Sequence, residues 1–353
     1  MIELIRAGLF SSVQDLGRTG HRHTGVTRSG ALDTVALRVA NRLVGNPEGA
    51  AGIEFTVGQP VQLRFIQATR IALTGADCAA TLDGQPIHAW WSQPVAAGQV
   101  LSLGVPSRGM RAYLGVAGGI GVPLVLGSRS TDLKSGFGGH DGRALRDGDH
   151  LPPDVAAAET AAATVPIDAS PFGVKPPGWC RFAQVLPARR VASRMASRIA
   201  RDHPRSGAEA QWVRVLRGPE YARFTHAAHD ALWNAEWTVT PASNRMGYRL
   251  GGPALARESG GELLSHAVLP GTLQVPPGGQ PILLMSDAQT AGGYPKLAMV
   301  ITADLWHLAQ TRLNAPLRFV ECSHADARQA SLDIETYFHQ LELAIRLRTE
   351  RRR

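Results

Sequence analysis

The chain has 353 residues, 44% of them hydrophobic, and this length suggests two domains that can each bury a core. No apolar run reaches the roughly 20 residues that a membrane-spanning helix requires, which argues against an integral helical membrane protein. The net charge of +8 suggests a nucleic-acid binder, but the excess lies in residues 187–205 and 346–353 without a recognition motif, so nucleic acid is not expected as a partner.

Residues 1–150 are predicted to form a first β-rich domain. Short apolar runs such as residues 61–65 are typical of strands, and Asp83-Gly84 predicts a hairpin turn. One helix is predicted over residues 34–44, because Asp33 is suited to cap it and its apolar positions fit one buried face. A fold with few helices among many short strands indicates β-barrels and not a parallel βαβ array.

Residues 151–207 are rich in Pro and Ala and then in Arg, and they are predicted to be a connector. Within it, residues 187–205 are compatible with a short basic helix or with disorder. Residues 208–325 are predicted to form a second β-rich domain, with helices over residues 224–235 and 303–311. Residues 326–353 are predicted to be a C-terminal helix, so the expected fold is mainly β with some α.

Several familiar sites are not expected. Residues 115–121 contain four glycines, but their spacing is not G-x-G-x-x-G and no helix pattern follows, so a strand–turn–strand is predicted. His21 and His23 have no third ligand at a useful spacing, and no metal site is predicted. The three cysteines are far apart and are expected to be reduced thiols. The first residues lack a signal-peptide core, which predicts a cytoplasmic protein.

Residues 272–296, TLQVPPGGQPILLMSDAQTAGGYPK, are the strongest candidate for a site. Two strand-like runs lead into a Gly-rich loop that carries a carboxylate, an amide, hydroxyls and an amine. Glycines allow close approach of the backbone to a ligand. The alternative is a turn that binds nothing. The candidate residues are Asp287, Gln289, Thr290, Tyr294 and Lys296, with Gly279, Gly292 and Gly293 as loop backbone.

Three other polar clusters are candidates for the same chemistry. Residues 13–18 contribute Asp15. Residues 28–33 contribute Arg28, Ser29 and Gly30, and the guanidinium of Arg28 suits a carboxylate or phosphate. Residues 243–250 combine Asn, Arg and Gly beside a turn. In the last two clusters, helix capping or turn formation is an equal alternative. The candidates from the last two clusters are Arg28, Ser29, Gly30, Asn244, Arg245 and Gly247.

These clusters, in this order, resemble the family of the 5-oxoprolinase C subunit, also described as allophanate hydrolase subunit 2-like and as the antagonist of a sporulation-kinase inhibitor. The matching stretches include RAGLFSSVQDLGRTGHRHTGV, SNRMGYRL and residues 272–296, and they extend over residues 5–325 with a gap near 152–210. The resemblance implies cyclophilin-like β-barrel domains. Thr27 and Thr34 depart from the family pattern, where Pro is frequent.

The resemblance also implies a function. The family forms an ATP-dependent 5-oxoprolinase from three proteins, called A, B and C, in which B and C phosphorylate the lactam and A completes ring opening to L-glutamate. ATP with Mg²⁺ is the expected cofactor, and the interface with the B protein is one candidate place for it. The alternatives are the carboxyltransferase component of a biotin-dependent urea or amide carboxylase, with no biotin attached to this chain, and a non-catalytic antagonist of a kinase-inhibitor-like partner.

Side-chain chemistry assigns roles to the candidates. Asp15 and Asp287 are predicted as a general base or Mg²⁺ ligand. Arg28, Arg245 and Lys296 are predicted to contact anions, with Lys296 counted among the catalytic groups. The amides of Asn244 and Gln289 are predicted to orient the substrate, with Ser29, Thr290 and Tyr294 as further contacts.

Overall fold

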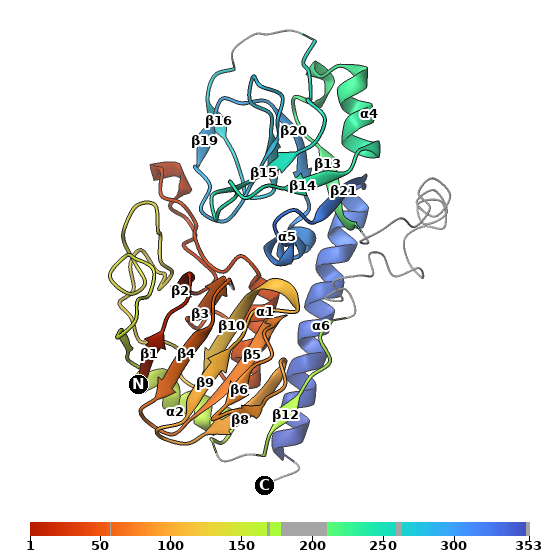
Figure 1. The fold of residues 1–353 in the computed structure, drawn as a ribbon. Coiled ribbons are helices and arrows are strands. Elements are labelled where there is room, and N and C mark those ends of the chain that lie inside the picture. Colours follow the sequence, from red (N-terminus) through yellow and green to blue (C-terminus); the bar gives the residue numbers. More distant parts are fainter. Residues whose placement is uncertain (57, 168–169, 178–209, 259–262, 351–353) are drawn as a thin grey trace. The chain divides into compact units, whose positions relative to one another are not determined.

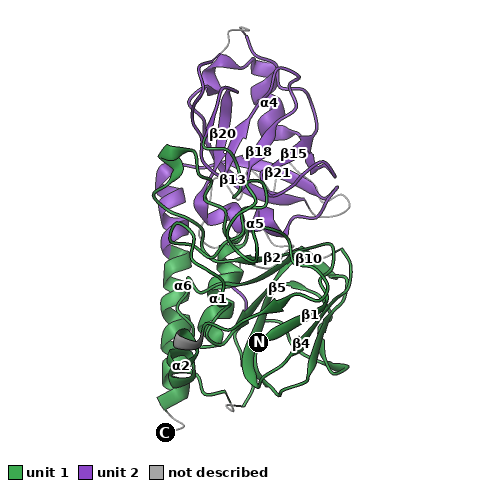
Figure 2. Cartoon of the chain, turned by 90° about the vertical axis from the view of Figure 1, so that its left-hand side faces the viewer, with its two compact units in different colours: residues 1–174, 286–290, 333–353 green, residues 175–285, 291–332 purple. Residues whose placement is uncertain are grey.

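The computed structural model describes residues 1–56, 58–167, 170–177, 210–258 and 263–350. It divides into two compact units (Figures 1 and 2). Unit 1 comprises Met1–Val174, Ser286–Thr290 and Asp333–Arg353, and unit 2 comprises Lys175–Met285 and Ala291–Leu332. The short segment Ser286–Thr290, which carries Asp287 and Gln289, therefore packs with unit 1, although the chain on both sides of it belongs to unit 2.

Unit 1 contains two six-stranded sheets, with strand orders β11-β1-β4-β9-β6-β7 and β12-β8-β5-β10-β3-β2. Their strand pairs are antiparallel. The elements are β1 (Ile2–Arg6), β2 (Phe10–Gln14), η1 (Arg22–Thr24), α1 (Thr34–Leu43), β3 (Gly52–Thr56), β4 (Val61–Phe65), β5 (Thr69–Asp77), β6 (Thr81–Leu82), β7 (Gln85–Pro86), β8 (Trp91–Val95), β9 (Val100–Leu103), β10 (Arg108–Val116), β11 (His150–Leu151), α2 (Val155–Thr164) and β12 (Phe172–Gly173).

The core of unit 1 combines apolar side chains from both sheets. In β4, Val61, Leu63 and Phe65 are buried, whereas the intervening side chains are more accessible, as expected for a strand with one face on a core. The hairpin at Asp83-Gly84 is confirmed, because β6 pairs with β7 and both turn residues have positive φ.

Helix α1 confirms the predicted cap. The Asp33 carboxylate accepts the Ala36 N–H at 2.8 Å, which satisfies one of the free donors at the helix start. The opposite, polar side of α1 contacts the C-terminal part of α6 (His324–Glu350). There Arg38 pairs with Glu335 at 2.9 Å, and its guanidinium lies 3.7 Å from the centroid of the Phe338 ring. The predicted C-terminal helix is thus present and stacks on unit 1 through these contacts.

Helix α2 lies where an exposed connector was expected. Alanine has the highest intrinsic helix propensity, and the Asp154 carboxylate accepts the Ala157 N–H at 3.3 Å as an N-cap. The Pro/Ala composition was therefore a helix signal as much as a linker signal. The predicted basic segment 187–205 and Cys180 lie outside the described residues.

Unit 2 contains a closed barrel, in the order β13-β20-β17-β18-β15-β14-β21, in which β13 and β21 are parallel neighbours. The mainly β fold with a C-terminal helix is confirmed. The elements are β13 (Gln211–Arg217), η3 (Tyr221–Arg223), α4 (His226–Asn234), β14 (Trp237–Val239), β15 (Gly247–Gly251), β16 (His266–Ala267), β17 (Thr272–Gln274), β18 (Ile282–Leu284), β19 (Ala291–Gly292), β20 (Lys296–Val300), η4 (Thr302–Asp304), α5 (Leu305–Gln310) and β21 (Pro316–Glu321).

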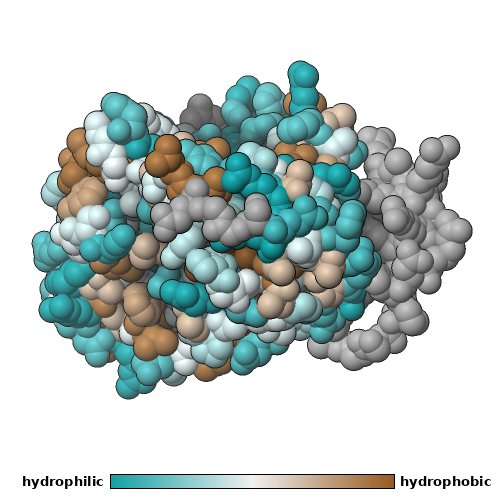
Figure 3. Space-filling view, turned by 90° about the horizontal axis from the view of Figure 1, so that it is seen from above, coloured by the Kyte–Doolittle hydropathy of each residue, from teal (hydrophilic) through white to brown (hydrophobic). Residues whose placement is uncertain are grey.

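Within the described part of the chain, no helix is long and apolar enough to cross a membrane. On the face visible in Figure 3, hydrophilic and hydrophobic residues are interspersed. This view therefore singles out no docking surface.

Candidate functional site

The loop that follows β2 is held by the buried carboxylate of Asp15. One carboxylate oxygen accepts the Gly17 N–H and the Ser128 hydroxyl, both at 2.7 Å, and the Ser130 hydroxyl also donates to it. The other oxygen accepts the Arg129 N–H at 2.6 Å. Three donors thus converge on one carboxylate oxygen and one donor reaches the other. In this arrangement Asp15 positions two loops.

Two glycines allow the Asp15 loop to lie against the Arg28 loop. Gly17 and Gly30 have φ values of +86° and +87°, and a Cβ on Gly17 would lie 2.7 Å from the Arg28 carbonyl oxygen. A Cβ on Gly30 would lie 2.7 Å from the Gly17 nitrogen. The Arg18 N–H donates to the same Arg28 carbonyl at 2.7 Å. Gly30, predicted as loop backbone, therefore serves close packing of one loop on another.

A second buried carboxylate, Asp132, is held in a similar way. Its Oδ2 accepts the Thr27 hydroxyl at 2.6 Å, and its Oδ1 accepts the N–H groups of Lys134 at 3.1 Å and Ser135 at 2.9 Å. The hydroxyl of Ser29 lies 3.2 Å from that of Thr27, and Ser29 is buried with φ +53°. Ser29 thus belongs to a buried network of hydroxyls and a carboxylate, and this network supports the loop that carries Thr27 and Ser29.

Arg18 lies at the centre of these loops and is only 1% exposed. Its Nε donates to the Val125 carbonyl at 3.2 Å, its Nη2 donates to the Ser130 carbonyl, and its Cζ lies 4.5 Å from the centroid of the Phe137 ring. The third nitrogen, Nη1, is buried with no hydrogen-bond partner among the described residues. The guanidinium is therefore held rigidly while one donor nitrogen remains unused.

The segment Ser286–Thr290 joins this cluster. Asp287 is 2% exposed. The backbone carbonyl of Gln289 accepts a hydrogen bond from Arg22 Nη2 at 3.3 Å. The carboxylates of both segments act on the same guanidinium. Desolvation lowers the pKa of Arg18, and the negative charges of Asp132, Asp15 and Asp287 raise it.

In unit 2, the amine of Lys296 is held at the start of β20. Its Nζ donates to the carbonyls of Gly292 at 3.3 Å and Tyr294 at 3.4 Å, and it lies 3.3 Å from His266 Nδ1. Desolvation lowers the pKa of Lys296, and the Glu220 carboxylate opposes this change. The Lys296 amine is therefore held in position by two carbonyls and by His266.

The Asn244 cluster forms a turn by itself. The Asn244 side-chain oxygen accepts the N–H groups of Met246 at 2.9 Å and Gly247 at 3.4 Å. Arg245, in the same turn, is 8% exposed. Gly279 adopts φ +77°, which favours glycine. The amide of Asn244 is thus engaged in the turn that was the alternative to substrate orientation, and its role toward a ligand stays a prediction.

The predicted site residues divide between the two units. Unit 1 holds Asp15, Arg28, Ser29, Gly30, Asp287, Gln289 and Thr290. Unit 2 holds Asn244, Arg245, Gly247, Gly279, Gly292, Gly293, Tyr294 and Lys296.

The sequence reasoning missed the residues around which the unit 1 cluster is built. They are Arg18 itself, the hydroxyls that fix Asp15, the carboxylate of Asp132 and the glycine that covers Arg18. At Gly138, with φ +69°, a Cβ would contact both Arg18 Nη2 and the Ser130 carbonyl. The available signal was the run GSRSTDLKSGFGGHDG, residues 127–142, which places hydroxyls and a carboxylate directly before closely spaced glycines.

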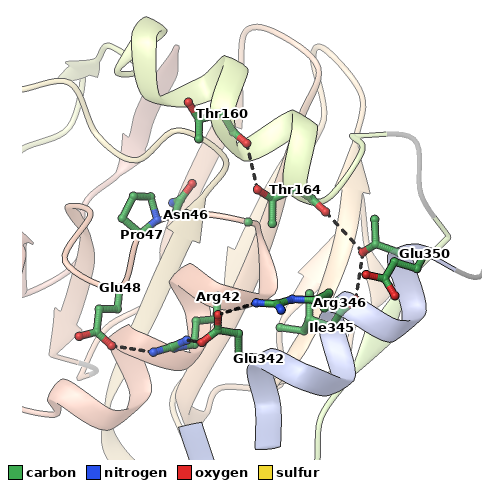
Figure 4. Close-up of a pocket in the computed structure, with 12 residues that line it drawn as sticks. Arg42, Asn46, Pro47, Glu48, Thr160, Thr164, Glu342, Ile345, Arg346 and Glu350 are labelled. Atoms are coloured by element: carbon green, nitrogen blue, oxygen red, sulfur yellow. Dashed lines mark hydrogen bonds and ion pairs between the residues drawn. The ribbon is translucent and has the colours of Figure 1, made fainter. Parts of the chain in front are cut away.

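A cavity of about 530 Å³ in unit 1 lies elsewhere, among α1, α2 and α6 (Figure 4). None of the predicted site residues lines it. Four of its charged side chains are paired with one another: Arg42 contacts Glu48 at 2.9 Å and Glu342 at 3.0 Å, and Arg346 contacts Glu342 at 3.3 Å. The cavity therefore does not coincide with the polar loops.

The loops of unit 1 suit an anion better than a metal ion. Among the residues that the structure describes, no three His, Cys, Asp or Glu side chains are grouped to hold a metal. The guanidinium of Arg28 is exposed, and its Nε and Nη2 donate to the Leu16 carbonyl at 3.2 and 3.1 Å. A guanidinium presents donors that match carboxylate and phosphate oxygens. Arg28 is thus chemically suited to contact a carboxylate or a phosphate.

Comparison with known proteins identifies relatives over nearly the whole chain. The model of the carboxyltransferase domain, subdomain A and B, matches residues 24–321. The 5-oxoprolinase C subunit of Escherichia coli (strain K12) is 46% identical over 341 residues, which are 97% of each chain. The urea amidolyase of Lachancea kluyveri is 32% identical over 96% of this chain but only 18% of its own length. The crystal structure of the Kluyveromyces lactis urea amidolyase superposes with a TM-score of 0.80 at 29% identity, covering 96% of this chain and 20% of that one.

Proposed function

The chain belongs to the family of the carboxyltransferase domain, subdomains A and B, and we propose that it is the C subunit of an ATP-dependent 5-oxoprolinase. The observation that carries this proposal is the 46% identity to a 5-oxoprolinase C subunit across 97% of both chains. A second relative with the same name, from Haemophilus influenzae, is 38% identical over the same shares. Full-length correspondence supports a similar division of labour within a complex, with separate B and A proteins as partners in the cytoplasm.

The reaction needs the lactam oxygen to become a leaving group. ATP, with Mg²⁺, would supply the phosphoryl group for that conversion. The chain's own contribution is to bind anionic groups, to orient the lactam and to stabilise developing charge. Arg28 presents an exposed guanidinium for an anion, and Gln289 lies on the segment that Arg22 holds. Asp287 is the candidate base.

Lys296 is the candidate for charge stabilisation or proton transfer in unit 2. Its amine already contacts two carbonyls and His266, so it is oriented before a ligand binds. Preorganised donors cost little reorganisation when charge develops in the transition state. Arg245, Thr290 and Tyr294 remain proposed substrate contacts, and Asp15 is proposed to act indirectly, by holding the loop on which Arg18 lies.

A second function has support in a specific observation. The chain also corresponds over 96% of its length to urea amidolyase, and the matching family model describes a carboxyltransferase domain. Carboxyl transfer to a urea-like amide would use the same cations and amide-orienting groups. The nearly complete coverage of the 5-oxoprolinase protein, against 18% of urea amidolyase, favours the first function.

The test is to co-express the chain with candidate A and B proteins and to measure ATP-dependent conversion of 5-oxoproline to glutamate, omitting each protein in turn. Lys296→Gln should reduce turnover by at least ~100-fold, the scale of losing an oriented donor. Lys134→Gln is the matched control, because the Lys134 side chain is exposed. Loss of turnover when this chain is omitted, as when the A or the B protein is omitted, supports the proposal. Turnover that persists without the chain, or transfer of a carboxyl group from carboxybiotin in its place, would contradict it.

A further inference from the structure

A carboxylate, an imidazole and an amine form a continuous chain of contacts within unit 2. Glu220 precedes η3, His266 begins β16 and Lys296 begins β20. The Lys296 Nζ lies 3.3 Å from His266 Nδ1, and His266 Nε2 lies 3.4 Å from Glu220 Oε1. The other oxygen of Glu220, Oε2, accepts the Lys296 backbone N–H at 2.8 Å. Three segments that are distant in the sequence thus close into one cycle of contacts.

Main-chain contacts fix the positions of these three residues. His266 pairs with Gly292 across β16 and β19, and the Gly292 carbonyl accepts a hydrogen bond from Lys296 Nζ. The Glu220 N–H donates to the Lys296 carbonyl at 3.4 Å. A Cβ on Gly218 would collide with that carbonyl, so the close approach of the segment before Glu220 requires a glycine.

The partners of His266 determine which of its ring nitrogens carries the hydrogen. A carboxylate only accepts hydrogen bonds, so Nε2, which faces Glu220, carries a hydrogen. An ammonium only donates, so Nδ1, which faces Lys296, is an acceptor. Both contacts therefore require the same neutral tautomer. Within the described part of the chain, Glu220 and Lys296 are the charged groups that contact this imidazole.

The surroundings of His266 also accommodate the protonated ring. Nδ1 lies 3.0 Å from the Leu264 carbonyl, and because a carbonyl accepts, this contact requires a hydrogen on Nδ1. The neutral ring thus pairs with Lys296 through Nδ1, and the imidazolium pairs with Leu264 through the same atom. The Nε2–H stays with Glu220 in both states. Since imidazoles change their charge near neutral pH, this position is suited to proton exchange.

Accessibility gives this chain of contacts a direction. Lys296 is 4% exposed, whereas the side chain of His266 is 44% exposed. The amine of Lys296 has three donors, and the carbonyls of Gly292 and Tyr294 engage two of them. His266 is therefore the titratable group that connects the third donor with solvent.

We propose that Glu220, His266 and Lys296 form a proton relay between solvent and the buried amine, an assignment that rests on the role of Lys296 in the proposed function. His266 Nδ1 takes a proton from the Lys296 ammonium and releases it to water, and the reverse transfer restores the ammonium. The Nε2–H remains on the ring throughout, and Glu220 is the positioning residue that holds it there. A base that is oriented by a third group is a general means of activating such a side chain.

Proton exchange at the Lys296 amine of the isolated chain tests the relay without turnover. The rate of exchange with water is measured by NMR of isotope-labelled lysine, with the exposed Lys134 as reference. His266→Asn keeps an oxygen acceptor but carries no titratable group, and it should slow exchange at Lys296 by at least ~10-fold. His324→Asn, at an exposed histidine of unit 2, is the matched control and should leave the rate unchanged. Equal exchange in His266→Asn and the wild type would overturn the relay.

Nitrogen NMR of the imidazoles tests the role of Glu220. With the ring neutral, the wild type should show His266 as the Nε2–H tautomer, assigned by the signal that His266→Asn removes. Glu220→Gln leaves one oxygen for two donors, the ring Nε2–H and the Lys296 backbone N–H, so the share of this tautomer should fall. An Nδ1–H tautomer in the wild type would contradict the proposal.

The reconstituted complex separates the relay from the proposed function. His266→Ala should lower kcat for 5-oxoproline by at least ~10-fold with KM unchanged, and added imidazole should restore turnover, which a purely structural role would not allow. A loss that imidazole does not restore, or full turnover by His266→Ala or His266→Asn, would remove the relay and leave the function intact. A complex that never converts 5-oxoproline, in which His266→Asn still slows amine exchange, would remove the function and leave the relay.

Discussion

Substitution of Gly138 by alanine should disturb the loop cluster through a single contact. A Cβ at this position would contact Arg18 Nη2 and the Ser130 carbonyl, the two groups that are hydrogen-bonded to each other. Gly136 is the matched control. Its φ is +70° against +69° for Gly138, and a Cβ there would meet nothing within 4 Å. Both variants therefore carry the same backbone strain, and only one of them carries the collision.

The magnitude follows from this difference. An alanine in the left-handed region costs roughly 1–2 kcal/mol, and this cost is common to both variants. Forcing an extra carbon into a packed site adds about 1–3 kcal/mol. Losing a charge-assisted hydrogen bond, here the one from Arg18 to Ser130, adds about 1.5–3 kcal/mol. Gly138→Ala should thus be less stable than Gly136→Ala by on the order of 3 kcal/mol.

Urea unfolding, combined with hydrogen exchange to assign the transition to unit 1, measures the difference. Separate assignment is needed because a chain with two units need not unfold in one step. Exchange should accelerate in the loops around Asp15 and Asp132 in Gly138→Ala and not in Gly136→Ala. Equal losses of stability in the two variants would refute the argument that Gly138 is required by its contact with Arg18.

Three further predictions concern polar groups that are buried or partly buried. Desolvation lowers the pKa of His307 to about 4, whereas the unfolded imidazole titrates near 6.5, so the unfolded state binds more protons between these values and stability falls as the pH drops through that window. Because His307 is partly accessible, the loss of unfolding free energy should be on the order of 1–2 kcal/mol. The variant His307→Gln should therefore show a flatter profile of stability against pH between pH 6.5 and 4. An unchanged slope in this variant would contradict the prediction. Asp304→Asn removes the carboxylate that pairs with Arg214 at 2.6 Å and should cost about 3–5 kcal/mol in urea unfolding. A cost below ~1 kcal/mol would show that the pair is dispensable. Tyr113→Phe removes the donor to Glu54 at 2.7 Å and should cost about 1–3 kcal/mol in the same assay, and a neutral effect would mean that the bond contributes nothing net.

Local signals were enough to predict several elements. Asp33 and the apolar spacing after it identified α1, and Asp83-Gly84 identified the β6–β7 hairpin, because a cap or a turn depends on residues within a few positions. The same local reasoning did not find α2, where an alanine-rich run was interpreted as a linker. The correct predictions of α1 and the hairpin and the missed helix α2 all rest on signals that lie within one short segment of the chain.

The candidate site shows a different limit. The sequence indicated Asp15 as a polar group beside a glycine, but its partners Ser128 and Ser130 are 113 and 115 positions away. Without those partners the carboxylate resembles a free base. With them it is a structural acceptor. Similarly, nothing local indicated that Ser286–Thr290 would pack with unit 1, away from its sequence neighbours.

By itself, the sequence determined the secondary elements with strong local signals, the mainly β class and the family to which the polar clusters belong. Only the tertiary structure decided which polar groups already have hydrogen-bond partners within the chain and which remain exposed. The physical reason is that hydrogen-bond satisfaction and burial are set by contacts between distant segments, at which a side chain such as Arg18 becomes buried among carboxylates and carbonyls. Residue type and spacing indicate which chemistry a side chain is capable of, and packing decides which of its donors and acceptors are already used within the chain.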